Sequence, residues 1–531
     1  MKENITKSMR KSIFLGLLFA AVLPLAAQQD AFDKFKQQQL DQFSQFKTDQ
    51  QAEFDAFRKR INEEYAEHLR KAWEIFPIHE AEKPQKEPEV KPVVFVEEQA
   101  TPEPSQPAPQ PTPTEEEKRA PKEDIKPVPT PKPTIETKPV EIPVKPKVVV
   151  VPAPQPAPEP IAPVKPKEEP FKKVSIAYFG TITTIGFPVD DKLHLAALNE
   201  SAIADAWELL SQPKYDITIS TALNARKANQ LCDWAYLQML QKACEKQYGK
   251  TNEAVLAQAF ILTQSGYRIR MGMANGKLYM LIASNYDIFD YSYYKLDGAK
   301  FYLLSKDQPQ QLQITQTKYG KERALSLQMA QLPTLGSNPT PKRTMTSKKG
   351  VTTAASVNKN LIDFFNTYPQ ACFIGNPTTR WAAYANTPLD KSVKNMLYPP
   401  LKKTIEGMSE REAVGILLNW VQTAFEYEYD DKVWGRAFFA QETLYYPYCD
   451  CEDRAILFSR LVRDLVKLDV VLLYYPGHLA SAVAFNEDGK GDYLTYKQRK
   501  YIVCDPTYIN AGIGRTMPGM NNQQAQVIAL K

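Results

Sequence analysis

Three residues near the C-terminal end of the chain have the types and order of a nucleophile, a base and an orienting acid: Cys451, His478 and Asp505. Cys451 follows a short polar loop and opens an apolar-periodic stretch, which predicts a helix beginning at the cysteine. Unpaired N–H groups and the helix dipole favour negative charge at a helix N-terminus. We therefore expect a lowered thiol pKa and a reactive thiolate at Cys451.

Two strand-like segments after this helix carry the other two residues. The run Val470 to Tyr474 leads to His478, which opens an alternating segment ending at Phe485; the run Tyr501 to Cys504 ends at Asp505. Consecutive antiparallel strands would place the histidine and the acid beside the helix start. There the imidazole takes the thiol proton and the carboxylate orients the ring. The other histidines lie far earlier in the chain: His68, His79 and His194.

This set of motifs resembles the transglutaminase-like superfamily. The resemblance covers about residues 397–510 and rests on three groups: Cys451 with Glu452, Asp453 and Ala455; Gly477 with His478; and Asp505 with Pro506 and Thr507. It implies a papain-like α+β core with a Cys-His-Asp triad, acting through a thioester on amide bonds, without metal or cofactor. The family usually has a glycine two residues before the nucleophile, where this chain has Cys449.

Other roles for the cysteines stay open at this point. Cys449 could be the nucleophile, or it could form a disulfide with Cys504 in an oxidising compartment. A zinc site from both of these cysteines with Cys451 and His478 has suitable ligand types but poor spacing. The backbone N–H of Cys451 is one donor for an oxyanion. A second donor could come from one of three preceding residues: Trp434, Gln441 and Tyr446.

The first 27 residues predict a secretory signal peptide. Lys2, Lys7, Arg10 and Lys11 precede an apolar run from Ile13 to Leu25, and small residues follow. The run is shorter than the roughly 20 residues of a membrane-spanning helix. We expect a protein secreted across the inner membrane, most simply into a bacterial periplasm.

Residues 28–76 predict a long amphipathic helix with an aromatic stripe. Phenylalanines recur in pairs with a period of eleven residues: Phe32 and Phe35, Phe43 and Phe46, Phe54 and Phe57. Eleven residues make three turns at about 3.67 per turn, so the stripe stays on one side of the helix. Such a face needs a partner. We expect self-association as a helical bundle, or docking on an envelope protein or membrane.

Residues 77–171 predict a disordered linker. This range contains 26 of the chain's 42 prolines, set among Lys, Glu, Val, Thr and Ala without a periodic apolar face. A segment of this composition favours extended conformations and forms no core. We interpret it as a spacer or tether.

Two ordered domains follow, at residues 172–345 and 346–531, and a weak internal repeat relates them. A shift of 201 positions lays Ala254–Asn285 on Ala455–Asn486 with six identities in 32 positions, and the unit reads as one helix followed by two strands in both copies. Cys451 then falls on Lys250, His478 on Lys277 and, after a one-residue gap, Asp505 on Ser305. The earlier domain is thus expected to be a degenerate, catalytically silent copy.

The formal net charge of +5 is small for 531 residues and gives no reason to expect nucleic-acid binding. The leading hypothesis is an exported cysteine hydrolase or acyltransferase acting on amide bonds of peptides or proteins, with water or an amine as acceptor. Hydrolysis of a peptide or peptidoglycan-type amide at the cell envelope is favoured because a spacer suits work at a distance. The alternative is a catalytically silent binding or scaffold protein of the envelope.

Overall fold

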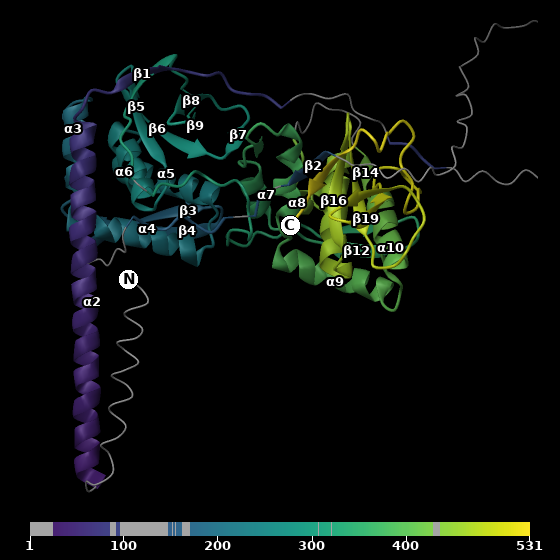
Figure 1. The fold of residues 1–531 in the computed structure, drawn as a ribbon, viewed down its shortest axis with the longest axis horizontal. Coiled ribbons are helices and arrows are strands. Elements are labelled where there is room, and N and C mark those ends of the chain that lie inside the picture. The colour runs from purple at the N-terminus through teal and green to yellow at the C-terminus, as the bar shows by residue number, and fades with distance from the viewer. Residues whose placement is uncertain are drawn as a thin grey trace, which may run out of the picture.

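The computed structural model describes residues 25–84, 92–95, 147–150, 152–153, 155–161, 170–305, 307–319, 321–427 and 436–531. The fold is α+β, as predicted. Two sheets of six strands each lie in separate halves of the molecule, and a long helix projects from the first half (Figure 1).

The first half is built around a sheet with strand order β1-β10-β5-β6-β9-β8. Its strands are β1 (Glu74–Pro77), β5 (Ile269–Ala274), β6 (Lys277–Ser284), β8 (Tyr293–Leu296), β9 (Ala299–Leu303) and β10 (Gln311–Ile314). Its other elements are β3 (Phe171–Tyr178), β4 (Thr181–Pro188), α3 (Glu200–Leu210), the 3₁₀ turn Pro213–Tyr215, α4 (Asp216–Ala228), α5 (Asp233–Tyr248), α6 (Asn252–Gln264) and β7 (Tyr286–Ile288). Strands β3 and β4 form a separate hairpin.

The second half contains a sheet with strand order β18-β19-β17-β16-β20-β2. Its strands are β2 (Lys147–Val150), β16 (Asp469–Tyr475), β17 (His478–Ala484), β18 (Tyr493–Tyr496), β19 (Arg499–Cys504) and β20 (Gln526–Ala529). The helices are α7 (Lys359–Phe365), α8 (Arg380–Asn386), α9 (Lys391–Ile405), α10 (Glu410–Thr423), α11 (Ala440–Thr443) and α12 (Cys451–Leu461), with a 3₁₀ turn at Pro377–Thr379 and a π-helical turn at Val462–Val466. Short strands pair elsewhere: β11 (Arg343–Thr346) with β12 (Thr352–Ala355), and β14 (Glu426–Tyr427) with β15 (Tyr448–Cys449).

The two sheets have the same strand connectivity, and the register of their central pairs agrees with the shift found in the sequence. Met273 pairs with Leu278 across β5 and β6, and 201 positions later Tyr474 pairs with Leu479 across β16 and β17. After the one-residue gap, β8 and β9 match β18 and β19 at a shift of 200: Tyr293 pairs with Tyr302, and Tyr493 with Ile502. The edge strands differ, since β1 is antiparallel to β10 whereas β2 is parallel to β20.

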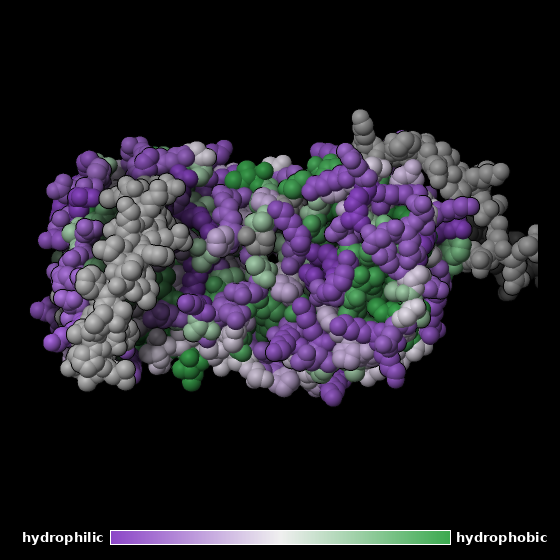
Figure 2. Space-filling view, turned by 60° about the horizontal axis from the view of Figure 1, so that its bottom comes forward, coloured by the Kyte–Doolittle hydropathy of each residue, from purple (hydrophilic) through white to green (hydrophobic). Residues whose placement is uncertain are grey.

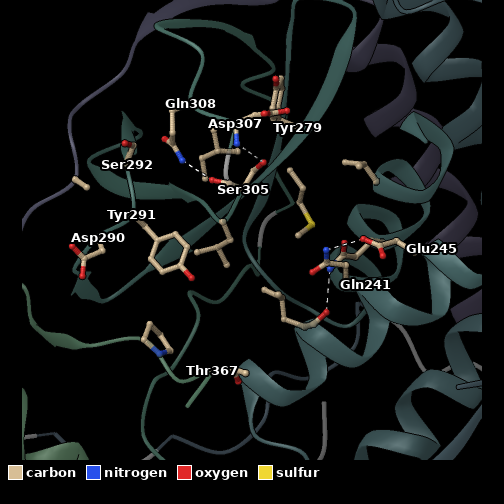
Figure 3. A pocket seen from close by; sticks show the side chains of 18 of the residues that line it. Gln241, Glu245, Tyr279, Asp290, Tyr291, Ser292, Ser305, Asp307, Gln308 and Thr367 are labelled. Atoms are coloured by element: carbon tan, nitrogen blue, oxygen red, sulfur yellow. Dashed lines mark hydrogen bonds between the residues drawn. The ribbon is translucent and has the colours of Figure 1, made fainter. Parts of the chain in front are cut away.

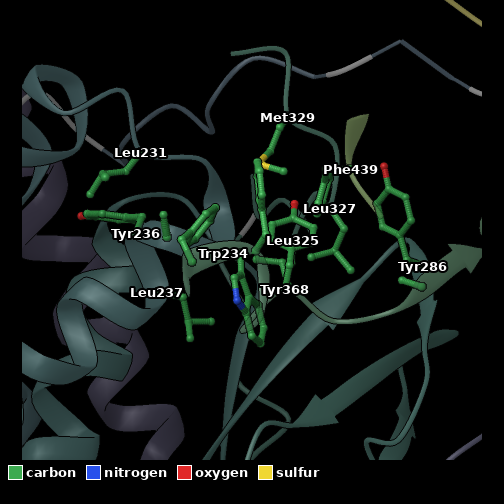
Figure 4. Close-up of a cluster of buried hydrophobic side chains, with 14 of the residues drawn as sticks. Leu231, Trp234, Tyr236, Leu237, Tyr286, Leu325, Leu327, Met329, Tyr368 and Phe439 are labelled. Atoms are coloured by element: carbon green, nitrogen blue, oxygen red, sulfur yellow. The ribbon is translucent and has the colours of Figure 1, made fainter. Parts of the chain in front are cut away.

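The two halves share strand pairing and a hydrophobic core across the predicted boundary at residue 345. Strand β13 (Ala371–Phe373) pairs with β7 of the first half. Tyr368 packs edge-on against Trp234 of α5 and also against Phe439, and Figure 4 shows these rings in one buried cluster. Such interlocking means that neither half encloses its apolar surface alone.

Helix α2 (Leu25–Leu69) realises most of the predicted amphipathic helix, but it ends before residue 76. The chain leaves the helix because Glu74–Pro77 adds to the sheet as β1. The last turns of α2 dock on the first half: Tyr65 stacks between Trp207 and Tyr319 and is buried. The rest of the helix extends well beyond the folded body (Figure 1).

The predicted linker is not uniformly unstructured. Three of its described pieces pack on the body: Lys147–Val150 forms β2, Val94 bridges to Ile509, and the N–H of Ile161 donates to the carbonyl of Gln264. Runs of valine and aromatic residues between the prolines have strand propensity, which explains why these pieces pair. Apart from residues 77–84, 92–95, 147–150, 152–153, 155–161 and 170–171, this range lies outside the described residues.

The predicted signal peptide also lies outside the described residues, except for its last three residues, which begin α2. None of the helices in the described ranges is long and apolar enough to span a bilayer. In Figure 2 hydrophilic side chains cover most of the face in view, and hydrophobic ones gather in patches over the second half.

Candidate catalytic site

Cys451 is the first residue of α12, as predicted, and a capping box fixes this helix start. The Asp450 carboxylate accepts the N–H of Asp453 at 3.3 Å, and the Asp453 carboxylate accepts the N–H of Asp450 at 3.2 Å. Asp453 also accepts the N–H of Phe438 at 2.6 Å, which ties the preceding segment to the helix. The Cys451 N–H is left without an acceptor among the described residues, so it is available to an oxyanion.

His478 and Asp505 form a buried pair. His478 begins β17, Asp505 directly follows β19, and Nε2 of the histidine lies 2.8 Å from Oδ2 of the aspartate, with both side chains at most 1 % exposed. A carboxylate only accepts hydrogen bonds, so this contact assigns the imidazole proton to Nε2. Nδ1 of the histidine is buried and has no hydrogen-bond partner in the described part of the chain. It is therefore a free proton acceptor.

The sulfur of Cys451 lies beside the start of β17. It accepts the backbone N–H of Leu479, the residue that follows His478. One helical turn further on, the Ser481 hydroxyl donates to the carbonyl of Ala455 at 3.5 Å, so α12 runs along β17 from the same end. The start of β17, which carries His478, thus lies beside the start of α12, which carries Cys451. In this structure the thiol donates to Oε2 of Glu452 at 3.0 Å, and it forms no hydrogen bond to His478.

The environment of the thiol differs from the sequence prediction. Burial raises the pKa of Cys451 well above its ordinary value, and the carboxylates of Glu452 and Asp450 raise it further. The Leu479 N–H acts in the opposite direction but is the smallest of these influences. The predicted lowering of the thiol pKa is therefore not found, because burial of the sulfur and the acidic side chains at the helix start together outweigh the helix dipole.

The two acids of the capping box also have raised pKa values. Burial raises the pKa of the Asp453 carboxyl to about 7, and it raises the pKa of Asp450 well above its usual range. Each acid also lies in the field of neighbouring carboxylates, which disfavours charge on both. A protonated acid next to the thiol would weaken the field that holds the sulfur neutral.

Side chains that the sequence prediction did not single out hold the site in place. Gln422 of α10 is buried, and its Nε2 contacts the carbonyls of Asp505, Tyr508 and Ala511 at 3.0, 2.8 and 3.1 Å. It thereby fixes the loop that carries the acid. The only sequence signal for this role is a glutamine within an otherwise apolar helix face.

Arg454 is a second supporting side chain. It is 1 % exposed, and its guanidinium donates to the carbonyls of Gln422 at 3.2 Å and Phe425 at 2.9 Å. The residue thus anchors α12 to the end of α10, and the signal in the sequence is an arginine three residues after Cys451, directly before an apolar stretch.

The structure also shows the surroundings of the cysteines for which other roles were considered. All six cysteines are unbridged, so no disulfide joins Cys449 to Cys504. The Cys449 thiol donates a hydrogen bond to the carbonyl of Glu426 and accepts one from the Nε–H of Arg454, each at 3.5 Å. Cys449 is 1 % exposed. Cys449 lies in β15 without a positive φ, so this backbone position does not require the glycine expected there.

Among the three residues considered as a second oxyanion donor, Gln441 has an N–H group without a partner among the described residues. Its Oε1 accepts the N–H of Asp390 at 3.0 Å, while its buried Nε2 has no partner within the described ranges. The Tyr446 hydroxyl donates to Asn366 at 3.1 Å. Trp434 lies outside the described residues.

A comparison of the chain with protein-family models, with curated proteins and with solved structures found no match in any of the three.

Proposed function

We propose that the protein is an exported transglutaminase-like cysteine hydrolase or acyltransferase that acts on amide bonds of peptides or proteins. The observation that carries the proposal is the buried His478–Asp505 pair, in which Nδ1 of the imidazole has no partner among the described residues and the next residue, Leu479, contacts the Cys451 sulfur through its N–H. The shared connectivity of the two sheets further supports the interpretation of residues 172–345 as a degenerate copy of the catalytic domain.

The chemistry follows from this arrangement. Rotation of the S–H from Glu452 toward Nδ1 lets His478 take the thiol proton, and Asp505 stabilises the resulting imidazolium. The thiolate attacks the substrate carbonyl carbon, a C–S bond forms, and the oxyanion takes the free N–H of Cys451. The C–N bond breaks as the imidazolium returns the proton to the leaving amine. Water or a second amine then cleaves the thioester, with His478 as the base.

Export and a soluble site of action in the periplasm are part of the same proposal. They rest on the residues of the N-terminal segment described above. The projecting helix α2 supports attachment to a partner or to other copies of the chain at a distance from the catalytic half.

A silent binding protein is the second candidate, and one observation favours it. The Cys451 thiol is held by Glu452 and its pKa is raised, which is the opposite of a primed nucleophile. In that case the triad geometry would be a structural remnant, as the equivalent positions in the first half already are.

The experiment that separates these candidates uses unfolded casein together with the fluorescent amine monodansylcadaverine. New N-termini report hydrolysis and fluorescent casein reports amine transfer. We expect one of the two products from the wild-type chain, a loss of about a thousandfold or more in Cys451→Ala and His478→Ala, and retention in Cys449→Ala. Equal product in Cys451→Ala, or no product from the wild-type chain, would overturn the enzyme proposal.

A further inference from the structure

A large open hollow lies in the first half of the molecule. Its volume is about 1430 Å³, and its walls come from α5, α6, β6, the loop after β9 and residues 366–370 of the second half. Figure 3 shows Ser305 and Gln308 on one side of this space, Gln241 of α5 on another, and Tyr291 facing them. The volume exceeds the roughly 300–1,000 Å³ of typical small-molecule sites, which favours a polymeric ligand.

The hollow occupies the place that corresponds to the catalytic site of the second half. The three residues aligned with the triad by sequence are Lys250, Lys277 and Ser305, and all three line this one hollow. They are drawn from the start of α6, the start of β6 and the segment after β9, just as the triad comes from α12, β17 and the segment after β19. The sequence shift and the geometry thus identify the same location independently.

The hydrogen bonds around these three positions resemble those around Cys451, His478 and Asp505, although the residue types differ. The N–H of Leu278 donates to Oδ1 of Asn252 at 2.9 Å, where its counterpart Leu479 donates to the Cys451 sulfur. In both halves a strand N–H therefore contacts a side chain at the start of the preceding helix, α6 in the first half and α12 in the second.

The segment after the strand shows a second match. The N–H of Asp307 donates to Oγ of Ser305 at 3.2 Å, and in the second half the N–H of Thr507 donates to Oδ1 of Asp505 at 2.8 Å. In place of the imidazole–carboxylate pair, Lys277 forms an ion pair with Asp307 at 2.5 Å. The backbone frame of the site is thus present in the first half without a thiol or an imidazole.

We propose that this hollow binds an extended polypeptide segment of low net charge and does not cut it. Its charged side chains balance, with three acids (Glu245, Asp290 and Asp307) and three bases (Lys250, Lys277 and Arg436). Between them lie amide and hydroxyl groups that match the N–H and C=O groups of a peptide backbone: Gln241, Asn252, Gln308, Gln370, Ser292 and Thr367. Tyr291 offers an apolar face to a side chain. The choice of a polypeptide over another neutral polymer rests on the proposed function of the equivalent site.

The wall of the hollow is joined to the catalytic half. Asn366 lines the hollow, and its Oδ1 accepts hydrogen bonds from Arg436 at 3.0 Å and from the Tyr446 hydroxyl at 3.1 Å. Tyr446 stands five residues before Cys451 in the loop that leads to the nucleophile. A chain held in the hollow would therefore be retained near the catalytic half, which would raise its effective concentration there.

The test measures binding of fluorescein-labelled, random-sequence peptides without charged side chains, by fluorescence anisotropy. The chain carries Cys451→Ala throughout, so that no peptide is consumed. Gln241→Trp places a bulky side chain at an exposed position in the wall, and we expect affinity to fall about tenfold or more, or about 1.4 kcal/mol. Lys242→Trp, on the next exposed position of α5 but outside the wall, is the matched control and should bind normally. Gln308→Trp obstructs the opposite side and should repeat the loss.

Unchanged affinity in both Gln241→Trp and Gln308→Trp would overturn the proposal, as would an equal loss in Lys242→Trp. Binding of a neutral oligosaccharide in place of the peptides would also overturn it. The outcome is separate from that of the enzyme proposal: a chain that forms no casein product but loses peptide binding in Gln241→Trp retains the hollow as a binding site and loses the catalytic function alone.

Discussion

At the scale of single residues, the contact of most interest is the one between Cys451, the proposed nucleophile, and the neighbouring Glu452. The thiol of Cys451 donates to Glu452, and this carboxylate raises the thiol pKa next after burial itself. The raised pKa favours the proton on sulfur, while Nδ1 of His478 has no hydrogen-bond partner among the described residues. Glu452 acts as a restraint on activation, because thiolate formation next to a carboxylate costs electrostatic energy.

Replacing Glu452 by glutamine should release this restraint. A thiol with a raised pKa forms thiolate only as the pH rises through that pKa. Removing the neighbouring negative charge lowers the thiol pKa, so the thiolate forms at lower pH. We expect Glu452→Gln to alkylate at Cys451 several-fold faster than wild type near neutral pH, with its pH–rate profile displaced toward acid. Iodoacetamide labelling followed by mass spectrometry of the Cys451 peptide measures both.

Glu406→Gln removes an exposed carboxylate at the end of α9 and is the matched control. Its profile should coincide with that of wild type. An unchanged profile in Glu452→Gln would show that burial alone determines the reactivity of the thiol.

At the scale of secondary-structure elements, the features that could be predicted from the sequence are those that depend on a local pattern of apolar residues. The start of α12 at Cys451 and the strands β16, β17 and β19 follow from apolar periodicity, and the helix–strand–strand repeat follows from a shift of the same pattern. The meeting of His478 and Asp505 follows from the antiparallel pairing of β17 with β19, although β18 lies between these two strands in the sequence.

Other features could not be predicted because they depend on distant partners. Helix α2 ends at Leu69 since β10, more than two hundred residues later, offers an edge to Glu74–Pro77. Likewise, the raised thiol pKa depends on how deeply the helix start is buried, and periodicity carries no information on that depth.

Helix α2 presents a row of apolar side chains that stay largely exposed in the described structure. Between 38 and 51 % of each remains exposed: Leu40, Phe43, Phe46, Phe54 and Phe57. The same eleven-residue spacing leads from Phe43 through Phe54 to Tyr65, which is buried against the first half. The stripe is thus divided into a docked end and a free arm, and exposed aromatic rows of this kind mark association surfaces.

We predict that the free arm joins copies of the chain. Phe43→Glu with Phe46→Glu should convert an oligomer into a monomer in sedimentation velocity, because charges on the apolar face cannot be buried in a helical bundle. Gln38→Glu with Gln45→Glu adds the same charge on the opposite side and should leave the oligomer intact. A wild-type chain that already sediments as a monomer would refute self-association and leave an envelope partner as the occupant of the stripe.

At the scale of the whole molecule, two copies of one sheet architecture are joined into a single core. The two halves have the same strand connectivity, yet the first has Lys250, Lys277 and Ser305 at the positions aligned with Cys451, His478 and Asp505, and the second contributes residues to the core of the first. Tyr368 lies at the junction: it packs against Trp234 of the first half and Phe439 of the second, and it is 6 % exposed. The position of one half relative to the other is thereby fixed by packing.

This continuity predicts that both halves unfold together. Cys244 in the first half and Cys504 in the second are both buried, so each reports the opening of its own half. Pulsed thiol labelling in increasing urea, read by mass spectrometry, should give one common midpoint for the two cysteines. Tyr368→Ala should lower both midpoints equally, by about 3–5 kcal/mol of unfolding free energy, since it removes a buried aromatic ring. Tyr368→Phe keeps the ring and deletes a hydroxyl that is buried without a hydrogen-bond partner among the described residues, so it should leave both midpoints unchanged or raise them. Separate midpoints for Cys244 and Cys504, or a shift in one of them alone, would mean that the halves are independent domains and that the hollow and the catalytic site are not held in a fixed relation.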